Sequence, residues 1–173
     1  TLKQLEPGQI AINYSQSNVT ADGLTHGMYL MLCEYLKDTP YAGRLISSEE
    51  IVSAVRGRKS KTEVEYIKSA IKETLLIFNQ VTETVKTGMS EQDVADFIIK
   101  VMNTKGLESA WDPDQCPAVF TGPESAGAHA NPTERRIQPG HIMNIDFGVR
   151  KNGYVSDLQR TWYFLRQGEK EAP

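Results

Sequence analysis

Apolar and polar residues alternate near the end of the chain in the way expected of two β-strands joined by a tight turn. The two runs, Ile142–Val149 and Tyr154–Phe164, flank the turn residues Lys151-Asn152-Gly153. Asn-Gly between alternating apolar runs is the strongest short-range sequence signal for a β-hairpin. The pattern therefore predicts an antiparallel hairpin with Asn152 and Gly153 at its tip.

This hairpin carries two aspartates, Asp146 and Asp157, whose placement follows from the predicted register. Gly148 should lie opposite Asp157, and Asp146 is two residues further along, so both carboxylates share one face. Such diagonal neighbours lie about 7–8 Å apart. Because the surrounding residues are largely apolar, we expect both faces to be covered, and two covered carboxylates need a counter-charge such as a divalent metal. The alternative, that these are ordinary solvated aspartates, stays open at this point.

Two amphipathic helices are predicted ahead of the hairpin. Ser60 and Glu63 have the spacing of a capping box, and apolar residues then recur at helical spacing to about Lys86. Ser90 is the predicted cap of a second helix that stops at Gly106. The expected core positions are Val64, Ile67, Ile71, Leu75, Phe78 and Val85 on the first helix, and Val94, Phe97, Ile98 and Val101 on the second.

The region before these helices is predicted to be a separate, smaller α/β part. A polar break at Arg56–Lys59 is the best candidate boundary, which gives parts 1–57 and 58–173 and an α+β fold overall. The elements expected in the first part are strands over Ile10–Ser15 and Leu45–Ile46, and helices over Gly27–Leu36 and Glu49–Val55.

Composition narrows the classes of function. With 173 residues and a net charge of −3, the chain lacks the basic surface expected of a nucleic-acid-binding protein. No apolar run approaches the roughly 18 residues of a membrane helix, and Thr1–Glu6 has no signal-peptide core. Cys33 and Cys116 lack metal-ligand spacing and are expected to stay reduced. We therefore expect a cytoplasmic protein that contacts neither nucleic acid nor membrane.

His129 is the candidate catalytic residue, and it lies in a glycine- and alanine-rich segment, Gly122–Asn131. A single histidine in such a loop is more often structural. Its small neighbours Gly127, Ala128 and Ala130 nevertheless permit close approach of a ligand. Imidazole also suits proton transfer near neutral pH. From the residues alone, both interpretations stay open.

A resemblance to a known family rests on motifs in a fixed order. They are Gly127–Pro132, Pro139–His141, Asn144–Gly148 and Gly153–Thr161. This ordered set resembles the pita-bread metallopeptidases, which include Xaa-Pro aminopeptidases, prolidases, methionine aminopeptidases and creatinase, and within them the Xaa-Pro peptidase branch. Residues 8–60 are similar to the end of that branch's amino-terminal domain.

The resemblance has concrete implications for fold and chemistry. It implies the N-terminal half of a pita-bread catalytic domain over 58–173, preceded over 1–57 by the end of a creatinase-like N-terminal domain. It also implies that Asp146 chelates one metal of a pair, that Asp157 bridges both, and that His129 contacts the substrate and the tetrahedral intermediate. In the family, two divalent ions (manganese, cobalt or zinc) hold a bridging hydroxide that attacks the peptide carbonyl. The implied reaction is cleavage of Xaa-Pro bonds in proline-containing peptides.

One departure from the family pattern sets a further expectation. The family completes its metal site with a histidine and two glutamates, which would follow Pro173. We therefore expect a piece of a longer, homodimeric peptidase, inactive alone and with metal absent or weakly bound. The alternative is a non-catalytic pita-bread module that binds peptides or proteins, although such relatives usually lack the aspartates. A creatinase-like hydrolase without metal also fits the retained aspartates less well.

Overall fold

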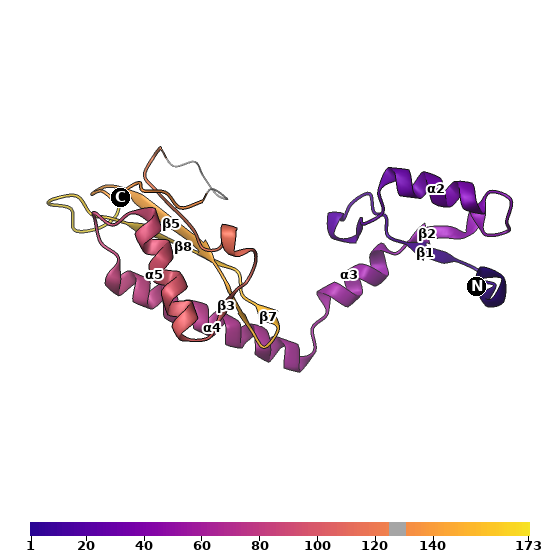
Figure 1. Ribbon diagram of the computed structural model, residues 1–173, viewed down its shortest axis with the longest axis horizontal. Coiled ribbons are helices and arrows are strands. Elements are labelled where there is room, and N and C mark those ends of the chain that lie inside the picture. The colour runs from indigo at the N-terminus through magenta and orange to yellow at the C-terminus, as the bar shows by residue number, and fades with distance from the viewer. Residues whose placement is uncertain (125–130) are drawn as a thin grey trace. The chain divides into compact units, whose positions relative to one another are not determined.

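Figure 1 shows the computed structural model of the chain, which describes residues 1–124 and 131–173. The chain divides into two compact units, Thr1–Lys59 and Ser60–Pro173. In the described part of the chain, no helix combines the length and apolar character needed to cross a membrane.

The first unit is a small α/β assembly. Strands β1 and β2 pair in parallel, with Ile10 opposite Leu45. Each predicted strand and helix is found within three residues of its expected bounds. The helix that begins at His26 is capped by Thr25, whose hydroxyl accepts from the backbone N–H of Met28. The elements are α1 (Leu2–Leu5), β1 (Ile10–Ile12), η1 (Val19–Ala21), α2 (His26–Leu36), η2 (Ala42–Arg44), β2 (Leu45–Ser47) and α3 (Glu49–Gly57).

The second unit begins with the two predicted helices, α4 (Lys61–Thr84) and α5 (Glu91–Thr104). Both start at a capping box. The Ser60 hydroxyl accepts from the backbone N–H of Glu63, and the Ser90 hydroxyl accepts from that of Asp93. Each box satisfies backbone donors that the first helical turn leaves without partners, so the sequence fixes both helix starts.

The strands of this unit form two antiparallel sheets of three strands each, in the orders β4-β5-β8 and β3-β6-β7. The predicted hairpin is confirmed: Lys151 pairs with Tyr154, and Asn152 and Gly153 at the tip both have positive φ angles. The elements are β3 (Glu108–Ser109), η3 (Pro113–Gln115), β4 (Ala118–Thr121), β5 (Ile142–Phe147), β6 (Val149–Lys151), β7 (Tyr154–Val155) and β8 (Leu158–Tyr163).

Each predicted hairpin strand is divided in two, which the sequence pattern did not indicate. The first strand breaks at Gly148, between β5 and β6, and the second breaks at Ser156 and Asp157, between β7 and β8. The breaks face each other across the hairpin, so the hairpin bends as a unit and passes from one sheet into the other.

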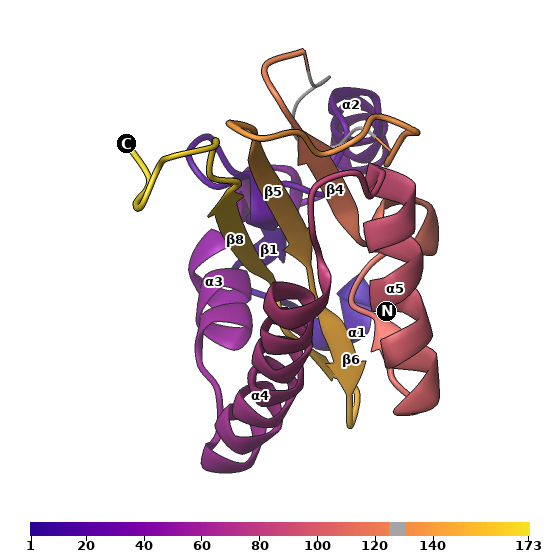
Figure 2. The same cartoon turned by 90° about the vertical axis from the view of Figure 1, so that its left-hand side faces the viewer.

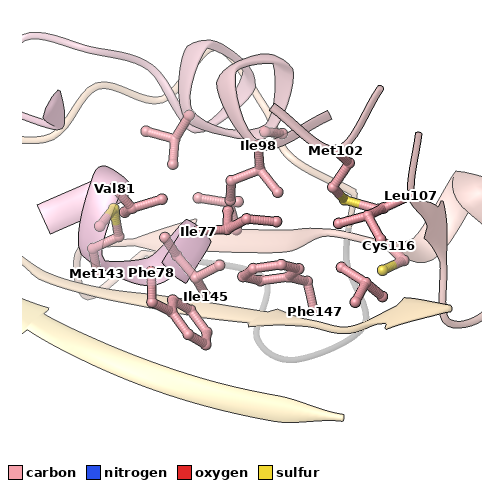
Figure 3. Close-up of a cluster of buried hydrophobic side chains, with 14 of the residues drawn as sticks. Ile77, Phe78, Val81, Ile98, Met102, Leu107, Cys116, Met143, Ile145 and Phe147 are labelled. Atoms are coloured by element: carbon pink, nitrogen blue, oxygen red, sulfur yellow. The ribbon is translucent and has the colours of Figure 1, made fainter. Parts of the chain in front are cut away.

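Both helices pack on one face of the β4-β5-β8 sheet, as Figure 2 shows. The hydrophobic core lies between these helices and the sheet. In Figure 3, Ile77 and Phe78 of α4 lie against Ile145 and Phe147 of β5. The rings of Phe78 and Phe147 meet edge-to-face, with centroids 4.7 Å apart.

The core positions predicted for α4 were partly right: Phe78 is buried and Val85 packs against the core, but two other positions are exposed. Val64 and Leu75 are each 37% exposed, whereas Ile77 and Val81 are fully buried. The physical reason is the small Ala70, which is also fully buried and continues the sheet-facing stripe toward the start of the helix. A count of large apolar residues alone therefore placed the buried face at the wrong angle around the helix.

A cluster of ion pairs joins the hairpin tip to α4 and to the residue that follows α5. The Glu73 carboxylate of α4 lies 2.7 Å from the Lys151 ammonium at the end of β6, and 3.0 Å from that of Lys105, which follows α5. The hydrogen bonds from both lysines hold the pKa of Glu73 below its ordinary value. The bond from Lys151 has the largest effect, and the bond from Lys105 the next largest.

This cluster predicts a pH-dependent contribution to stability. Because the folded-state pKa is lowered, the contribution is present above the unfolded-state pKa of about 4.3 and is lost as the pH falls through the folded-state value. We expect Glu73→Gln to lower the free energy of unfolding by about 1 kcal/mol at pH 7 and by much less at pH 3. Urea denaturation at both pH values measures this, with Glu65→Gln, which removes an exposed α4 ion pair, as the control. An equal loss at both pH values would refute the assignment.

Candidate metal centre

Asp146 and Asp157 lie on the two arms of the hairpin, which keep one register on both sides of the bend. Asp146 is in β5, opposite Gln159 of β8, and Asp157 immediately precedes β8. The pairs Lys151–Tyr154 and Phe147–Leu158 belong to the same register, so no residue is inserted at the bend. Gly148 therefore lies opposite Asp157, and the register predicted from the Asn-Gly turn is confirmed.

The structure brings the two carboxylates to one cavity of about 330 Å³, whose lining is Trp111, Gln115, Ala118, Asp146 and Asp157. Trp111 is held by its indole N–H, which donates to the carbonyl of Gln115 at 2.9 Å. Trp111 and Gln115 were not predicted as site residues, because the segment between β3 and β4 has no periodic pattern of apolar residues. A large aromatic residue next to a proline turn was the available signal.

The expectation that both hairpin faces are covered is wrong for the face that carries the aspartates. Met143, Ile145 and Phe147 are fully buried on the opposite face, where α4 and α5 pack. On the aspartate face, Asp146 is half-buried and Asp157 is exposed. The two carboxylates therefore point to a surface that a ligand can reach, and solvent reduces the electrostatic cost of holding them close together.

Two buried hydroxyls fix the bend beside Asp157. The hydroxyl oxygens of Ser156 and Thr74 of α4 lie 2.7 Å apart, and both residues are buried. The Ser156 hydroxyl also accepts from the backbone N–H of Val149 at 2.9 Å. Since Asp157 is the next residue, these contacts hold the backbone from which its carboxylate extends.

The donor set of the cavity suits a divalent cation. Carboxylate oxygens are hard ligands that manganese and similar ions accept, and Asp146 and Asp157 offer four such oxygens. Among the residues that the structure describes, no group of three or more His, Cys, Asp or Glu side chains is arranged to hold a metal ion. The pair therefore fits part of a metal site.

The candidate catalytic residue, His129, lies outside the described residues. Described residues on either side of its segment, Thr121 at the end of β4 and Thr133, are both held by α5. The assignment of His129 therefore stays a prediction.

Comparison with known proteins identifies the family. The sequence profile of metallopeptidase family M24 matches residues 65–172, which is well over half of the chain. The chain belongs to metallopeptidase family M24. The resemblance that the sequence motifs indicated is confirmed.

Relatives of this M24 chain carry names of Xaa-Pro peptidases. It is 25% identical to the Xaa-Pro dipeptidase of Pyrococcus furiosus over 89% of this chain and 43% of that protein. Among solved structures, an X-Pro aminopeptidase from Thermotoga maritima aligns with a TM-score of 0.67 at 23% identity, covering 92% of this chain and 41% of that one. A Xaa-Pro dipeptidase from Bacillus anthracis also gives 0.67 at 23% identity, covering 95% and 42%.

These structures confirm the predicted fold class. The M24 chain has a partial pita-bread fold, since it matches the X-Pro aminopeptidase closely over about two-fifths of that chain. It likewise spans 37% and 43% of the length of two curated relatives that it matches. The activity of the whole protein is therefore a matter for proposal.

Proposed function

We propose that this M24 chain is part of a longer dinuclear-metal peptidase that cleaves Xaa-Pro peptide bonds. In this proposal Asp146 chelates one metal ion, Asp157 bridges two, and His129 is the catalytic histidine. Manganese, cobalt and zinc are the candidate ions. The longer protein is proposed to be a cytoplasmic homodimer that acts on proline-containing peptides.

The observation that carries the proposal is the meeting of Asp146 and Asp157 at one cavity of about 330 Å³ in an M24 fold. A cavity near this size takes a small peptide side chain, and small-molecule sites begin at about 300 Å³. Relatives named as Xaa-Pro peptidases supply the substrate class. The competing function, a non-catalytic peptide-binding module, would not require a pair of carboxylates to hold metal ions beside the cavity.

Each residue of the site has a distinct task in this proposal. Bound divalent ions would activate a water molecule and stabilise negative charge on the scissile carbonyl. The carboxylates of Asp146 and Asp157 hold cations beside the cavity. The Trp111 ring, fixed by its bond to Gln115, forms a wall against which a substrate side chain packs. The imidazole of His129 donates a hydrogen bond to the oxyanion that develops in the transition state.

The proposal predicts different behaviour for the 173-residue chain and for the longer protein. Dinuclear sites need enough anionic ligands to offset two dications about 3.5–4 Å apart, and Asp146 and Asp157 supply only two of them. We expect that the chain alone binds no metal pair at micromolar manganese and hydrolyses no Xaa-Pro peptide. The longer protein should bind two ions per chain and cleave such peptides. Calorimetric titration and a hydrolysis assay on both proteins measure this.

Two outcomes would contradict the proposal. Two-site micromolar binding by the 173-residue chain would mean that its own residues complete the metal site. A longer protein that binds proline-containing peptides without cleaving them, at saturating manganese, would favour the non-catalytic module instead. A peptide of the same length without proline is the substrate control, since the proposal requires selective cleavage before proline.

A further inference from the structure

The Val149–Ser156 pair at the bend of the hairpin departs from a regular β-ladder. The register on both sides of the bend places these two residues opposite each other. The backbone N–H of Ser156 donates to the Val149 carbonyl at 3.1 Å, as a regular ladder requires. In the part of the chain that the structure describes, however, the return bond from the Val149 N–H goes to the Ser156 hydroxyl, at 2.9 Å, and not to the Ser156 carbonyl. A side chain thus replaces a backbone acceptor in the ladder.

The Ser156 carbonyl lies against Gly148 instead. Its oxygen is 1.8 Å from the place that a Cβ would take on Gly148. The carbonyl can turn away from Val149 because the Ser156 hydroxyl accepts from the N–H of this fully buried residue, and a buried N–H without an acceptor is strongly unfavourable. Asp157 is the next residue, and it lies between this irregular pair and the regular pair Phe147–Leu158. The direction in which the backbone enters Asp157 therefore depends on the Ser156 hydroxyl.

Thr74 of α4 holds that hydroxyl from the core side. Thr74 is fully buried, and its hydroxyl oxygen lies 2.7 Å from that of Ser156. Each hydroxyl has one proton to donate and two lone pairs. If Ser156 donates to Thr74, then Thr74 donates to the Ala70 carbonyl at 3.3 Å. If Thr74 donates to Ser156, then Ser156 donates to the Val149 carbonyl at 3.4 Å. Both buried hydroxyls are therefore satisfied, and the bend is tied to the helix.

We propose that Thr74 is a positioning residue for the Asp157 carboxylate and, through it, for the cations of the proposed site. The inference rests on the proposed role of Asp157 as a metal ligand. The ladder determines which residue Asp157 faces, whereas the bond between Thr74 and Ser156 holds the irregular backbone from which its carboxylate extends. Groups that orient the ligands of a metal typically contribute about 10–100-fold to its affinity.

Two substitutions separate this role from a general contribution of α4 hydroxyls to stability. Thr74→Val keeps the shape of the side chain and removes the hydroxyl, whereas Thr74→Ser keeps the hydroxyl and removes only the methyl group. Thr82→Val is the matched control in the same helix, because the Thr82 hydroxyl accepts from the Trp162 indole N–H at 3.0 Å, away from the bend. If Thr74→Val fails to fold, Ser156→Ala tests the same link, since Thr74 keeps the Ala70 carbonyl as its acceptor.

Amide hydrogen exchange of the 173-residue chain tests the link at the bend. In Thr74→Val we expect the Val149 amide to exchange about tenfold faster or more relative to the Ile145 amide of β5, because the hydroxyl that accepts from Val149 is no longer held. The ratio to Ile145 removes the effect of a general loss of stability. Thr74→Ser and Thr82→Val should leave this ratio near its native value, and Ser156→Ala should raise it. An unchanged ratio in Thr74→Val would overturn the proposal.

Calorimetric titration of the longer protein with manganese tests the link to the metal site. We expect Thr74→Val to weaken manganese binding on the order of tenfold, whereas Thr74→Ser and Thr82→Val keep near-native affinity. Near-native affinity in Thr74→Val, or an equal loss in Thr82→Val, would overturn the inference and leave the proposed metal site intact. If Asp157→Ala binds both ions with native affinity, the proposed role of Asp157 fails, and the inference about Thr74 fails with it.

Discussion

Asp157→Ala is expected to remove nearly all Xaa-Pro peptidase activity from the longer protein. Asp157 lines the cavity with Asp146, and in the proposed site it bridges both cations. Loss of a ligand that holds two ions should cost several kcal/mol of transition-state stabilisation. The fold should survive, because the Asp157 side chain is exposed and the backbone beside it is held by the hydroxyl of Ser156.

The experiment measures kcat/KM at saturating manganese together with metal content and melting temperature. Asp114→Ala is the matched control, since it removes the same charge from an exposed position in η3 that does not line the cavity. We expect near-native activity in the control and near-native melting temperatures in both variants. Wild-type turnover by Asp157→Ala would show that Asp157 is not a metal ligand.

Local signals in the sequence predicted the parts of the fold that depend on them. The Asn152-Gly153 turn fixes the hairpin register, and the strand period of two then places Asp146 and Asp157 on one face. The caps at Ser60 and Ser90 likewise fix the starts of α4 and α5. In each case a few neighbouring residues satisfy their own backbone groups, so the local sequence is enough to predict the feature.

Features set by tertiary packing could not be predicted in this way. The buried face of α4 includes the small Ala70, which periodicity of large apolar residues does not reveal. Trp111 reaches the candidate site from a segment with no regular pattern. Glu91 reads in the sequence as an ordinary acid in the first turn of a helix, and only the structure shows its bonds to Thr121 and Thr133.

Among the features set by tertiary packing, the bend at Gly148 has the largest expected effect on the free energy of unfolding. The motif Asp146-Phe147-Gly148 suggested family membership but gave no physical reason for the glycine. The structure gives one. A Cβ atom at Gly148 would lie 1.8 Å from the carbonyl oxygen of Ser156 and 2.9 Å from the Cβ of Ala110. Ala110 and Ser156 are both held in place. The backbone N–H of Ala110 donates to the Gly148 carbonyl at 3.0 Å, and the Ser156 hydroxyl is hydrogen-bonded to that of Thr74.

Gly148→Ala is therefore expected to lower the free energy of unfolding by about 3 kcal/mol or more, because backbone atoms rather than a flexible side chain must move. The shift would also move Asp157, which faces Gly148 across the ladder, so the longer protein should lose metal affinity as well. Urea denaturation of the 173-residue chain measures the stability change, and calorimetry of the longer protein measures the metal affinity.

Gly153→Ala in the same hairpin is the matched control. Gly153 has a φ of +79°, but a Cβ there meets nothing within 4 Å. Its substitution should cost only the backbone strain of about 1–2 kcal/mol. Comparing the two variants thus separates the cost of backbone strain from the cost of a steric clash. The clash at Gly148 should lower the free energy of unfolding by more. A Gly148→Ala variant that unfolds at the same urea concentration as Gly153→Ala would mean that the bend relaxes freely, and the aspartate pair would then not depend on this glycine.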